Sequence, residues 1–559
     1  METRRYILAI GLSMLVLMTY FRFFAPQPPV EQASPPEPQT AARETVQEKA
    51  PAPAKVRPSG VAVAIPVATI GRDIVIETDL LKAVVNTAGG VITKWELKQY
   101  RDANKEEVGV MVLWHKLTGP AQEAKPKQVL GNVQLFTIYD RANRDDVIAP
   151  LTITPTDKAL RNLAAVEFRS NAEAIRLDKD KKSQTLVLTY AGPAGIAIEK
   201  KLTFHNNEFK VDVAITTMGV DGYSVALGTD FGISDKISSD ASGRVGIVAV
   251  VDGKTVREKI GDIKGEMQHA GVIDWIGQED KYFTATVLYG GQGIITTKKT
   301  SAPVEIGDLL NTDLLVKDKP ESRTLTLYAG PKSFTALQAY GKGLETMVDY
   351  GWFGLLAKPM FWLMQKFYVF TGNYGIAIIL LTIVVRILLF YPSLKSATAM
   401  EEMKTLQPEM TALREKYKKD PQKLNQEMMR LYKEHKVNPL GGCLPMLLQL
   451  PFFVALYNVL SVSIELRQAS FIPFWIKDLS VYDPFYILPV LMGVSMVFTM
   501  KMTSTTVDPQ QQKIMMFMNI AFIFLFAWLP AGLLLYITLS NVLPIVQQLY
   551  VRKIIAAGK

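Results

Sequence analysis

Hydrophobic residues are distributed unevenly along this chain of 559 residues. Long apolar runs lie near the N-terminus and after residue 350, whereas the stretch between them alternates apolar and polar positions. An apolar run of about 18 residues predicts a transmembrane helix, and alternation with a period of two predicts a β-strand. The pattern therefore predicts an α-helical membrane protein with a large all-β domain inserted after its first apolar run.

The first apolar run, residues 1–24, starts with Arg4 and Arg5 and continues with 16 uncharged residues. A cleaved secretory signal has the same layout, but no small-x-small cleavage site follows here. An uncleaved transmembrane anchor with a cytoplasmic N-terminus is the favoured interpretation. Residues 25–60 hold nine prolines and no apolar period, which predicts an extended linker.

Residues 61–341 consist of short alternating runs that are rich in Val, Ile, Thr and aromatic residues. This composition and period predict a large antiparallel β-sandwich. The clearest runs are DIVIETD (73–79), KAVVNT (82–87), GGVITKWEL (89–97), QTLVLTY (184–190), FKVDVAITT (209–217), YFTATVLY (282–289), GIITTK (293–298) and SRTLTLY (322–328). Two similar runs, TLVLTYAGP (185–193) and TLTLYAGP (324–331), suggest a related pair of edge strands.

Residues 342–372 combine Trp, Phe and Met with a few charges, which predicts an amphipathic helix in the membrane interface, broken near Pro359. Residues 373–392 predict the second transmembrane helix, and Arg386 is its only charged residue. Such a charge is costly in the membrane, so either its guanidinium snorkels to the interface or it faces a water-filled cavity. Thr382 lies one turn earlier on the same face, which favours a cavity.

Residues 393–441 hold ten Lys or Arg and seven Asp or Glu, and their apolar positions are spaced three and four apart. With a break at Asp420 and Pro421, this pattern predicts a cytoplasmic helical hairpin. Such a hairpin is either a solvated spacer or an element that docks or gates.

Residues 442–551 hold apolar runs for transmembrane helices three to six, the last two hinged at Pro530 and Gly532. Residues 552–559 form a short basic tail. The segments on the predicted cytoplasmic side hold 2, 10, 2 and 3 Lys or Arg, and the opposite loop, residues 465–483, holds 2. The excess predicts six transmembrane helices in the inner membrane, with both termini in the cytoplasm and the β domain in a Gram-negative periplasm.

The remaining composition excludes several classes of site. A single cysteine, Cys443, rules out an intramolecular disulfide and a zinc site built on several cysteines, and the four histidines are scattered. Gly253, Lys254 and Thr255 resemble part of a phosphate loop, but Val248 stands where the loop needs its first glycine. The net charge of +9 is not gathered into a patch with interleaved aromatic residues, as nucleic-acid binding would require. We therefore expect no enzyme activity, metal, cofactor or nucleotide.

Four runs carry a resemblance to a known family. They are TGNYGIAIILLTIVVR (371–386), VNPLGGCLPMLLQLPFFVALY (437–457), DPFYILPVLMG (483–493) and QQKIMMFM (511–518). They closely resemble the YidC membrane protein insertases of the Oxa/Alb family, in the Gram-negative form with a large periplasmic domain. The resemblance covers the whole chain, from the anchor through the β-sandwich to the five-helix insertase core.

The resemblance implies a hydrophilic groove that is open to the cytoplasm and to lipid, with the family's arginine at Arg386. Thr382, Gln449 and Tyr536 match other positions of that groove. Two further polar residues of the apolar runs, Ser495 and Thr499, are candidates to line it, although such residues also serve as packing contacts between helices. The chain departs from relatives at two positions, with Ile537 where a second tyrosine can occur and Asn519 where a proline can occur.

The partners that the resemblance implies are nascent membrane proteins, the Sec translocon, the lipid bilayer, and a ribosome bound by the hairpin and the basic tail. Two other functions compete with an insertase. A secondary transporter would show paired repeats with matching interrupted helices, and no second copy of the Arg386 run exists. A β-sandwich that binds or transforms a ligand while tethered to the membrane would need convergent polar groups that the sequence does not display.

Overall fold

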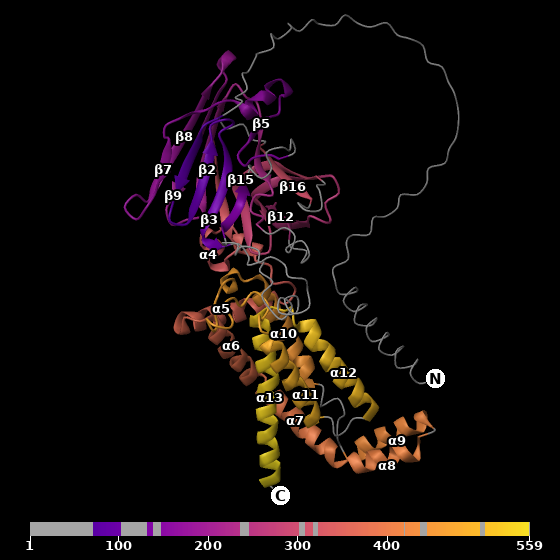
Figure 1. Cartoon of the computed structure of the whole chain (residues 1–559). Helices are drawn as coiled ribbons and strands as arrows, with labels where there is room; N and C mark the ends of the chain where they lie inside the picture. The colour runs from indigo at the N-terminus through magenta and orange to yellow at the C-terminus, as the bar shows by residue number, and fades with distance from the viewer. Residues whose placement is uncertain are drawn as a thin grey trace, which may run out of the picture. The chain divides into compact units, whose positions relative to one another are not determined.

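The computed structural model describes residues 71–101, 131–137, 147–234, 245–300, 308–316, 322–418, 420–435, 444–503 and 509–557. Residues 62–559 form one compact unit. The predicted anchor at 1–24 and the predicted linker at 25–60 lie outside the described residues, as do the side chains of the basic tail. Within the described ranges the chain contains a large β domain followed by helices (Figure 1).

The β domain holds two sheets. The smaller has five strands in the order β4-β3-β2-β1-β7. Its strands are β1 (Asp73–Glu77), β2 (Leu81–Asn86), β3 (Val91–Arg101), β4 (Asn132–Thr137) and β7 (Ala174–Arg176). The pair β1 and β7 is parallel, so the prediction of a wholly antiparallel sandwich is wrong at this edge. A parallel pair needs a long connection, and the chain between these strands provides it.

The larger sheet has twelve strands, nine of them in the order β13-β12-β14-β15-β17-β10-β9-β8-β6. Strand β11 pairs with β16 and β5, and β16 also pairs with β15. The strands are β5 (Ile153–Pro155), β6 (Arg169–Ser170), β8 (Ser183–Ala191), β9 (Ala197–His205), β10 (Lys210–Met218), β11 (Tyr223–Thr229), β12 (Gly246–Val251), β13 (Lys254–Lys259), β14 (Glu266–Glu279), β15 (Phe283–Thr300), β16 (Leu309–Val316) and β17 (Ser322–Pro331). Two short 3-10 helices, η2 (Lys158–Ala165) and η3 (Pro193–Gly195), lie in the connections.

Two details of the strand prediction are wrong. The runs at 282–289 and 293–298 belong to one strand, β15, which continues past Gly290 at a φ of 70° while its partner β14 shifts register. The run at 324–331 lies in β17, which pairs with β10 on one side and β15 on the other, so it is not an edge strand. Gly290 allows β15 to bend without ending the strand.

The run Gly253-Lys254-Thr255 lies in a hairpin. Residues Asp252 and Gly253 form the two-residue turn between β12 and β13, with φ values of 50° and 72°. Positive φ at both positions is typical of the type I′ turn that joins antiparallel strands. This backbone is not the strand-to-helix loop that binds nucleotide phosphates.

The two sheets pack their apolar faces against each other. Trp95 of β3 is fully buried and donates its indole N–H to the Ala329 carbonyl of β17 over 3.1 Å. Its ring lies edge-on to the Phe231 ring, with 5.8 Å between the centroids, and Phe136 of β4 also packs on the Phe231 ring. The bond from Trp95 to Ala329 joins strands more than 200 residues apart, and the three aromatic rings lie in the core of the domain.

A buried lysine also joins the two sheets. Lys200 of β9 is 0% exposed and donates from Nζ to the carbonyls of Gly89, Gly90 and Leu151, over 2.8, 3.0 and 2.8 Å. All three acceptors have positive φ, which is rare for leucine. Lys200 therefore fixes the turn between β2 and β3 and the strained backbone before β5.

The β domain is followed by α4 (Phe334–Tyr340), η4 (Leu344–Met347) and α5 (Gly354–Thr371). Helix α5 continues through Pro359, so the predicted break there is wrong. Pro359 lies near the helix start and removes the backbone bond to one carbonyl, which distorts a helix without ending it. One face of α5 is buried, whereas Leu355 and Phe370 on the other are 89% and 87% exposed.

Helix α6 (Tyr374–Leu388) begins where the Asn373 side chain accepts a bond from the Ile376 N–H. After Leu389 the chain continues directly into α7 (Phe390–Thr405), which contains Pro392, the predicted end of the span. Helices α8 (Gln407–Lys416) and α9 (Pro421–Glu434) follow and pack against each other. Their contact buries Leu406, Met410 and Leu431.

The last helices are α10 (Leu444–Val462), η6 (Ile464–Leu466), α11 (Ile487–Thr503), α12 (Pro509–Phe526) and α13 (Ala531–Ala557). Helix α12 runs straight through Asn519, and Pro530 lies between α12 and α13. Within the described residues, Ala531–Leu549 of α13 has both the length and the hydropathy of a membrane span. The apolar stretches of α6, α10, α11 and α12 are shorter, so the count of six spans stays a prediction.

Candidate functional site

The candidate site centres on Arg386, on the last turn of α6. Its Nη2 donates to the Gln449 Oε1 of α10 over 3.0 Å and to the backbone carbonyl of Ser540 on α13. The site therefore joins three helices that are adjacent in Figure 1 although they lie far apart in the sequence. Arg386 and Gln449 are both half-buried.

The charge of Arg386 has no carboxylate partner within 4 Å among the residues that the structure describes. Both of its hydrogen bonds leave from Nη2, whereas a guanidinium has five N–H donors. Among the described residues, none accepts a hydrogen bond from the Nε or Nη1 group, so these donors can reach other acceptors. A half-buried cation with unused donors attracts anionic or polar groups more strongly than one in open water.

Tyr536 of α13 lies in the same cluster and is 1% exposed. Its hydroxyl interacts with Gln449, Ser540 and Arg386, although none of these contacts has full hydrogen-bond geometry. Its ring stacks on Phe453 of α10 at 6.3 Å between centroids. Ile537, which follows it, is 9% exposed and belongs to the apolar core of the helices.

The other three predicted site residues make different contacts. The hydroxyls of Thr382, Ser495 and Thr499 donate to carbonyls three or four residues earlier in their own helices, over 2.7, 2.6 and 2.9 Å. Hydroxyls in helices commonly make such local bonds. Thr382 is fully buried and Ser495 is 6% exposed. The structure thus brings together Arg386, Gln449 and Tyr536, while the roles of the other three stay predictions.

Contacts beside Arg386 involve residues that the sequence did not single out. Ser393 of α7 donates its hydroxyl to Gln547 Oε1 of α13 over 3.0 Å, and Gln547 Nε2 donates to the Phe390 carbonyl over 3.3 Å. Ser540 and Gln547 are seven residues apart, so they lie on one face of α13. That spacing of polar residues in an apolar run is the sequence signal that marks this face.

The motif at 483–493 has a structural role that its sequence did not reveal. Asp483 is fully buried, accepts the indole N–H of Trp475 over 2.7 Å, and accepts the backbone N–H groups of Phe485 and Leu488. It therefore fixes the connection before α11 and satisfies an N–H group near the start of that helix. The contact needs a tryptophan eight residues earlier, which only the folded loop brings close.

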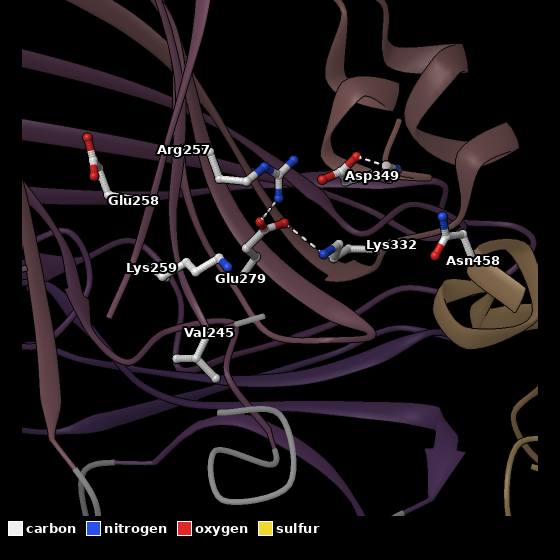
Figure 2. Close-up of a pocket in the computed structure, with 10 residues that line it drawn as sticks. Val245, Arg257, Glu258, Lys259, Glu279, Lys332, Asp349 and Asn458 are labelled. Carbon is white, nitrogen blue, oxygen red and sulfur yellow. Dashed lines mark hydrogen bonds and ion pairs between the residues drawn. The ribbon is translucent and has the colours of Figure 1, made fainter. Parts of the chain in front are cut away.

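A second polar region is a cavity of about 200 Å³ lined by the β domain, by Asp349 and Gly351 before α5, and by Asn458 of α10 (Figure 2). Glu279 is buried there and forms ion pairs with Arg257 and, over 2.7 Å, with Lys332. Lys332 also donates to the Asp280 carbonyl over 2.9 Å. The cavity lining is balanced in charge, with Arg257, Lys259 and Lys332 against Glu258, Glu279 and Asp349, so the region has the character of a structural junction rather than a reactive centre.

Within the described ranges, no group of three or more His, Cys, Asp or Glu side chains is placed to hold a metal ion. Several helices instead expose large apolar side chains. Trp352, Leu355, Trp362, Val369 and Phe370, in and just before α5, are 61% to 89% exposed, and Phe517, Phe524 and Leu525 of α12 are 63% to 75% exposed. Apolar surface on this scale is unfavourable in water and is typical of contact with lipid or protein.

Comparison with known proteins gives one consistent family. The model of the YidC periplasmic domain matches residues 122–363, and the model of the 60Kd inner membrane protein matches residues 366–558. The membrane protein insertase YidC of Geobacter metallireducens is 34% identical over 567 aligned residues, which cover 100% of this chain and 99% of that protein. The membrane protein insertase YidC of Geotalea uraniireducens is also 34% identical, over 98% of this chain and 99% of the relative.

Among solved structures, an active YidC insertase with its first transmembrane domain resolved covers 87% of this chain and 94% of its own. The identity is 19% and the TM-score is 0.36, so this likeness adds nothing to the assignment. The full-length relatives and the two family models carry it, and they confirm the resemblance seen in the sequence. The chain therefore belongs to the YidC family of membrane protein insertases.

Proposed function

We propose that this chain inserts membrane proteins into the inner membrane and assists their folding, with Arg386 receiving the polar part of the client. The observation that carries the proposal is the environment of Arg386. Its cation is held by an amide oxygen and a backbone carbonyl, with donors to spare and no acidic partner within 4 Å among the described residues. A membrane protein that retains such a costly group has a use for it.

In this mechanism the client supplies the free energy. A segment of about 20 apolar residues gains roughly 6 to 12 kcal/mol on reaching lipid, at about 0.3 to 0.6 kcal/mol for each residue. That gain offsets a few translocated charges at about 3 kcal/mol each. The insertase therefore needs no nucleotide, and its task is to lower the barrier for the polar flank.

A hydrophilic groove beside Arg386 would lower that barrier. The guanidinium attracts acidic or polar groups of the client while the apolar segment moves sideways into lipid. Thr382, Gln449, Tyr536, Ser495 and Thr499 are the further residues that we assign to this groove. Helix α11 is 17 residues long, or about 25 Å at 1.5 Å per residue, and a span this short thins the bilayer locally.

The membrane topology that fits this function has six spans, five of them in the insertase core, with both termini in the cytoplasm and the β domain in the periplasm. The domains are an anchor at 1–24, a linker at 25–60, the β-sandwich at 61–341, an interfacial helix at 342–372 and the second span at 373–392. A cytoplasmic hairpin at 393–441, the spans within 442–551 and a basic tail at 552–559 complete the chain. The excess of Lys and Arg in the short cytoplasmic segments supports this orientation.

The partners that we propose for this chain follow from the same membrane topology. The hairpin of α8 and α9 and the basic tail are the surfaces that we assign to the ribosome, because they combine many basic residues with a position on the cytoplasmic side. The Sec translocon, which the family resemblance implies, is the second partner that we assign. Neither the fold nor the polar cluster requires a bound cofactor.

The experiment is insertion of two clients into proteoliposomes that contain the purified full chain, one client with an acidic translocated tail and one with a neutral tail. Arg386→Ala is expected to slow the acidic client at least about tenfold, since charged hydrogen bonds contribute about 1.5–3 kcal/mol. Arg386→Lys retains a positive charge and is expected to keep most of the activity. Protease protection of the tail measures the rate.

Arg169→Ala is the matched control, because Arg169 lies exposed on β6 of the β domain. It is expected to insert both clients at the normal rate. Normal insertion of the acidic client by Arg386→Ala would show that the charge handles no client in this protein. Equal slowing of both clients would show that Arg386 supports the helices rather than receiving acidic tails.

A further inference from the structure

The short helix η6, between α10 and α11, enters the base of the β domain. Ile464 is 3% exposed and packs in the same apolar core as the strands. Leu466, two residues later, is fully buried in the core formed by the helices. One turn of chain from the helical core therefore inserts a side chain into the β domain, so η6 is a contact between the two.

Polar contacts accompany this insertion. Arg467 Nη2 donates to the Arg101 carbonyl at the end of β3 over 2.9 Å, and Gln468 Nε2 donates to the same carbonyl over 3.0 Å. The Arg467 guanidinium also lies over the rings of Tyr282 and Phe283, at 5.7 and 5.0 Å from their centroids. Cation–π contacts of this kind favour the docked position of η6.

Glu465 lies between Ile464 and Arg467 in the sequence and has few partners. The residue is half-buried, and its Oε1 is buried without a hydrogen bond within the described part of the chain. The backbone N–H of Glu465 itself and the Ser333 hydroxyl interact with the carboxyl group. Arg467 forms no ion pair with it within 4 Å, because its guanidinium points to Arg101 and the aromatic rings. Burial raises the pKa of Glu465. A buried carboxyl without a cation is more stable when protonated.

Three tyrosines face Glu465 from neighbouring elements. Tyr100 comes from β3, Tyr350 from the segment before α5, and Tyr374 from the start of α6. Burial raises the pKa of Tyr100 to about 12 and raises that of Tyr350 as well. Among the described groups around it, Glu465 is therefore the carboxyl whose charge changes when the pH passes its raised pKa.

We propose that Glu465 is a proton-dependent latch between the β domain and the helical core. When its carboxyl is protonated, η6 stays inserted and the β domain is held against the helices. When the carboxyl ionises, the buried charge favours withdrawal of η6 into water, and the β domain gains freedom to move.

The direction of the pH effect on docking follows from the difference in the pKa of Glu465 between the docked and the undocked state. Undocked, the carboxyl has its usual pKa near 4.3, and docking raises that value. The docked form is therefore favoured at low pH and weakens as the pH rises through the docked pKa. Between the undocked and the docked pKa the ratio of docked to undocked molecules falls by up to about tenfold for each pH unit, and above the docked pKa it no longer changes. Acidification of the periplasm therefore tightens the latch, and a rise in pH loosens it.

The test measures the distance between the β domain and the helices in the full chain, reconstituted in nanodiscs. Spin labels replace Lys179, which is exposed after β7, and Phe370, which is 87% exposed on α5, in a Cys443→Ser background. Pulsed electron paramagnetic resonance at pH 5, 6.5 and 8 reads the distance distribution. The wild-type chain is expected to give a narrow distribution at pH 5 that broadens by pH 8.

Glu465→Gln carries no charge at this position at any pH and is expected to keep the narrow distance distribution at all three pH values. Glu345→Gln, on η4, is the control and is expected to broaden like the wild type. A wild-type distribution that does not change with pH would overturn the latch, and so would unchanged broadening in Glu465→Gln. Glu465→Met, also uncharged, is expected to behave like Glu465→Gln, which separates the loss of charge from any effect of the amide. The readout is a distance, so it stands apart from any measurement of insertion.

Discussion

Among the residues that the structure describes, neither Lys200 in the β domain nor Arg386 in the helices has a carboxylate partner within 4 Å, and the two cations differ in how their donors are used. The three protons of the Lys200 ammonium match three backbone carbonyls, and the side chain is 0% exposed. Arg386 is half-buried and makes two bonds, both from one nitrogen. All three N–H donors of the Lys200 ammonium have acceptors in the fold, whereas only one nitrogen of Arg386 has acceptors among the described residues.

The difference separates a structural role from a functional one. A donor set that the protein satisfies completely has nothing left for a ligand, and removing it leaves buried acceptors unpaired. A donor set satisfied only in part is held in place and still able to bind. Loss of Lys200 should therefore affect stability, whereas loss of Arg386 or its partner should affect insertion.

The largest effect is expected from Lys200→Met. Three buried carbonyls, at Gly89, Gly90 and Leu151, lose their donor, and each unpaired buried group costs about 1–3 kcal/mol. We expect the free energy of opening of β9 and of the turn before β3 to fall by about 3 kcal/mol. Amide hydrogen exchange of the corresponding peptides in the full chain measures this free energy.

Lys201→Met is the matched control for that measurement. Lys201 is the next residue of β9, and its side chain is 49% exposed. Substitutions at exposed positions usually change stability by less than about 0.5 kcal/mol. If both variants lost the same small amount, the three-carbonyl account of Lys200 would be wrong.

The pH dependence of stability is the next largest effect. Burial lowers the pKa of Lys200 to about 7, whereas the unfolded lysine titrates near its usual value of about 10.4. Between these values the unfolded chain holds a proton that the folded chain has released, so raising the pH favours folding. Stability of the β domain is expected to rise from pH 7 to pH 9 by up to about 1.4 kcal/mol per unit.

The same hydrogen-exchange measurement, corrected for intrinsic exchange rates, checks this slope of stability against pH. Lys200→Met has no amine to titrate at that position, so the part of the slope that comes from Lys200 should be missing. A slope of equal size in both chains would assign the pH dependence to other groups.

The smallest effect is expected from Gln449→Leu. The substitution removes the amide oxygen that accepts a bond from Arg386 and leaves the Ser540 carbonyl in place. Arg386 keeps its charge and its bond to Ser540 in this variant, so insertion of an acidic client should slow by only about threefold, less than in Arg386→Ala. Gln338→Leu, at an exposed position of α4, serves as the control. Slowing as large as that of Arg386→Ala would show that Gln449 itself receives the client.

Patterns within the sequence were sufficient for several features of the fold. Alternating apolar residues marked the strands of the β domain, and the helix-rich second half followed from long apolar runs. The motif around Arg386 and the run at 437–457 indicated the family, which the full-length relatives confirm. These signals are local, because a strand, a helix or a short motif is visible in consecutive residues.

Errors arose where a local signal has two structural outcomes. Glycine at 290–291 can end a strand or bend it, and here the strand continues. Proline at 359 can break a helix or distort it, and here the helix continues. The outcome depends on whether neighbouring strands and helices still satisfy the backbone on both sides, and a sequence window contains no information about those neighbours.

The sequence by itself determined the class of protein, the alternation of strands, the apolar runs, the position of the one arginine in the second of them, and the family. Only the tertiary structure decided what each buried polar group contacts. It placed Arg386 against Gln449 and Ser540, Lys200 on three carbonyls, and Ile464, next to Glu465, in the core of the β domain. Burial and pairing are properties of residues that lie far apart in the sequence, and only folding brings those residues within hydrogen-bond distance.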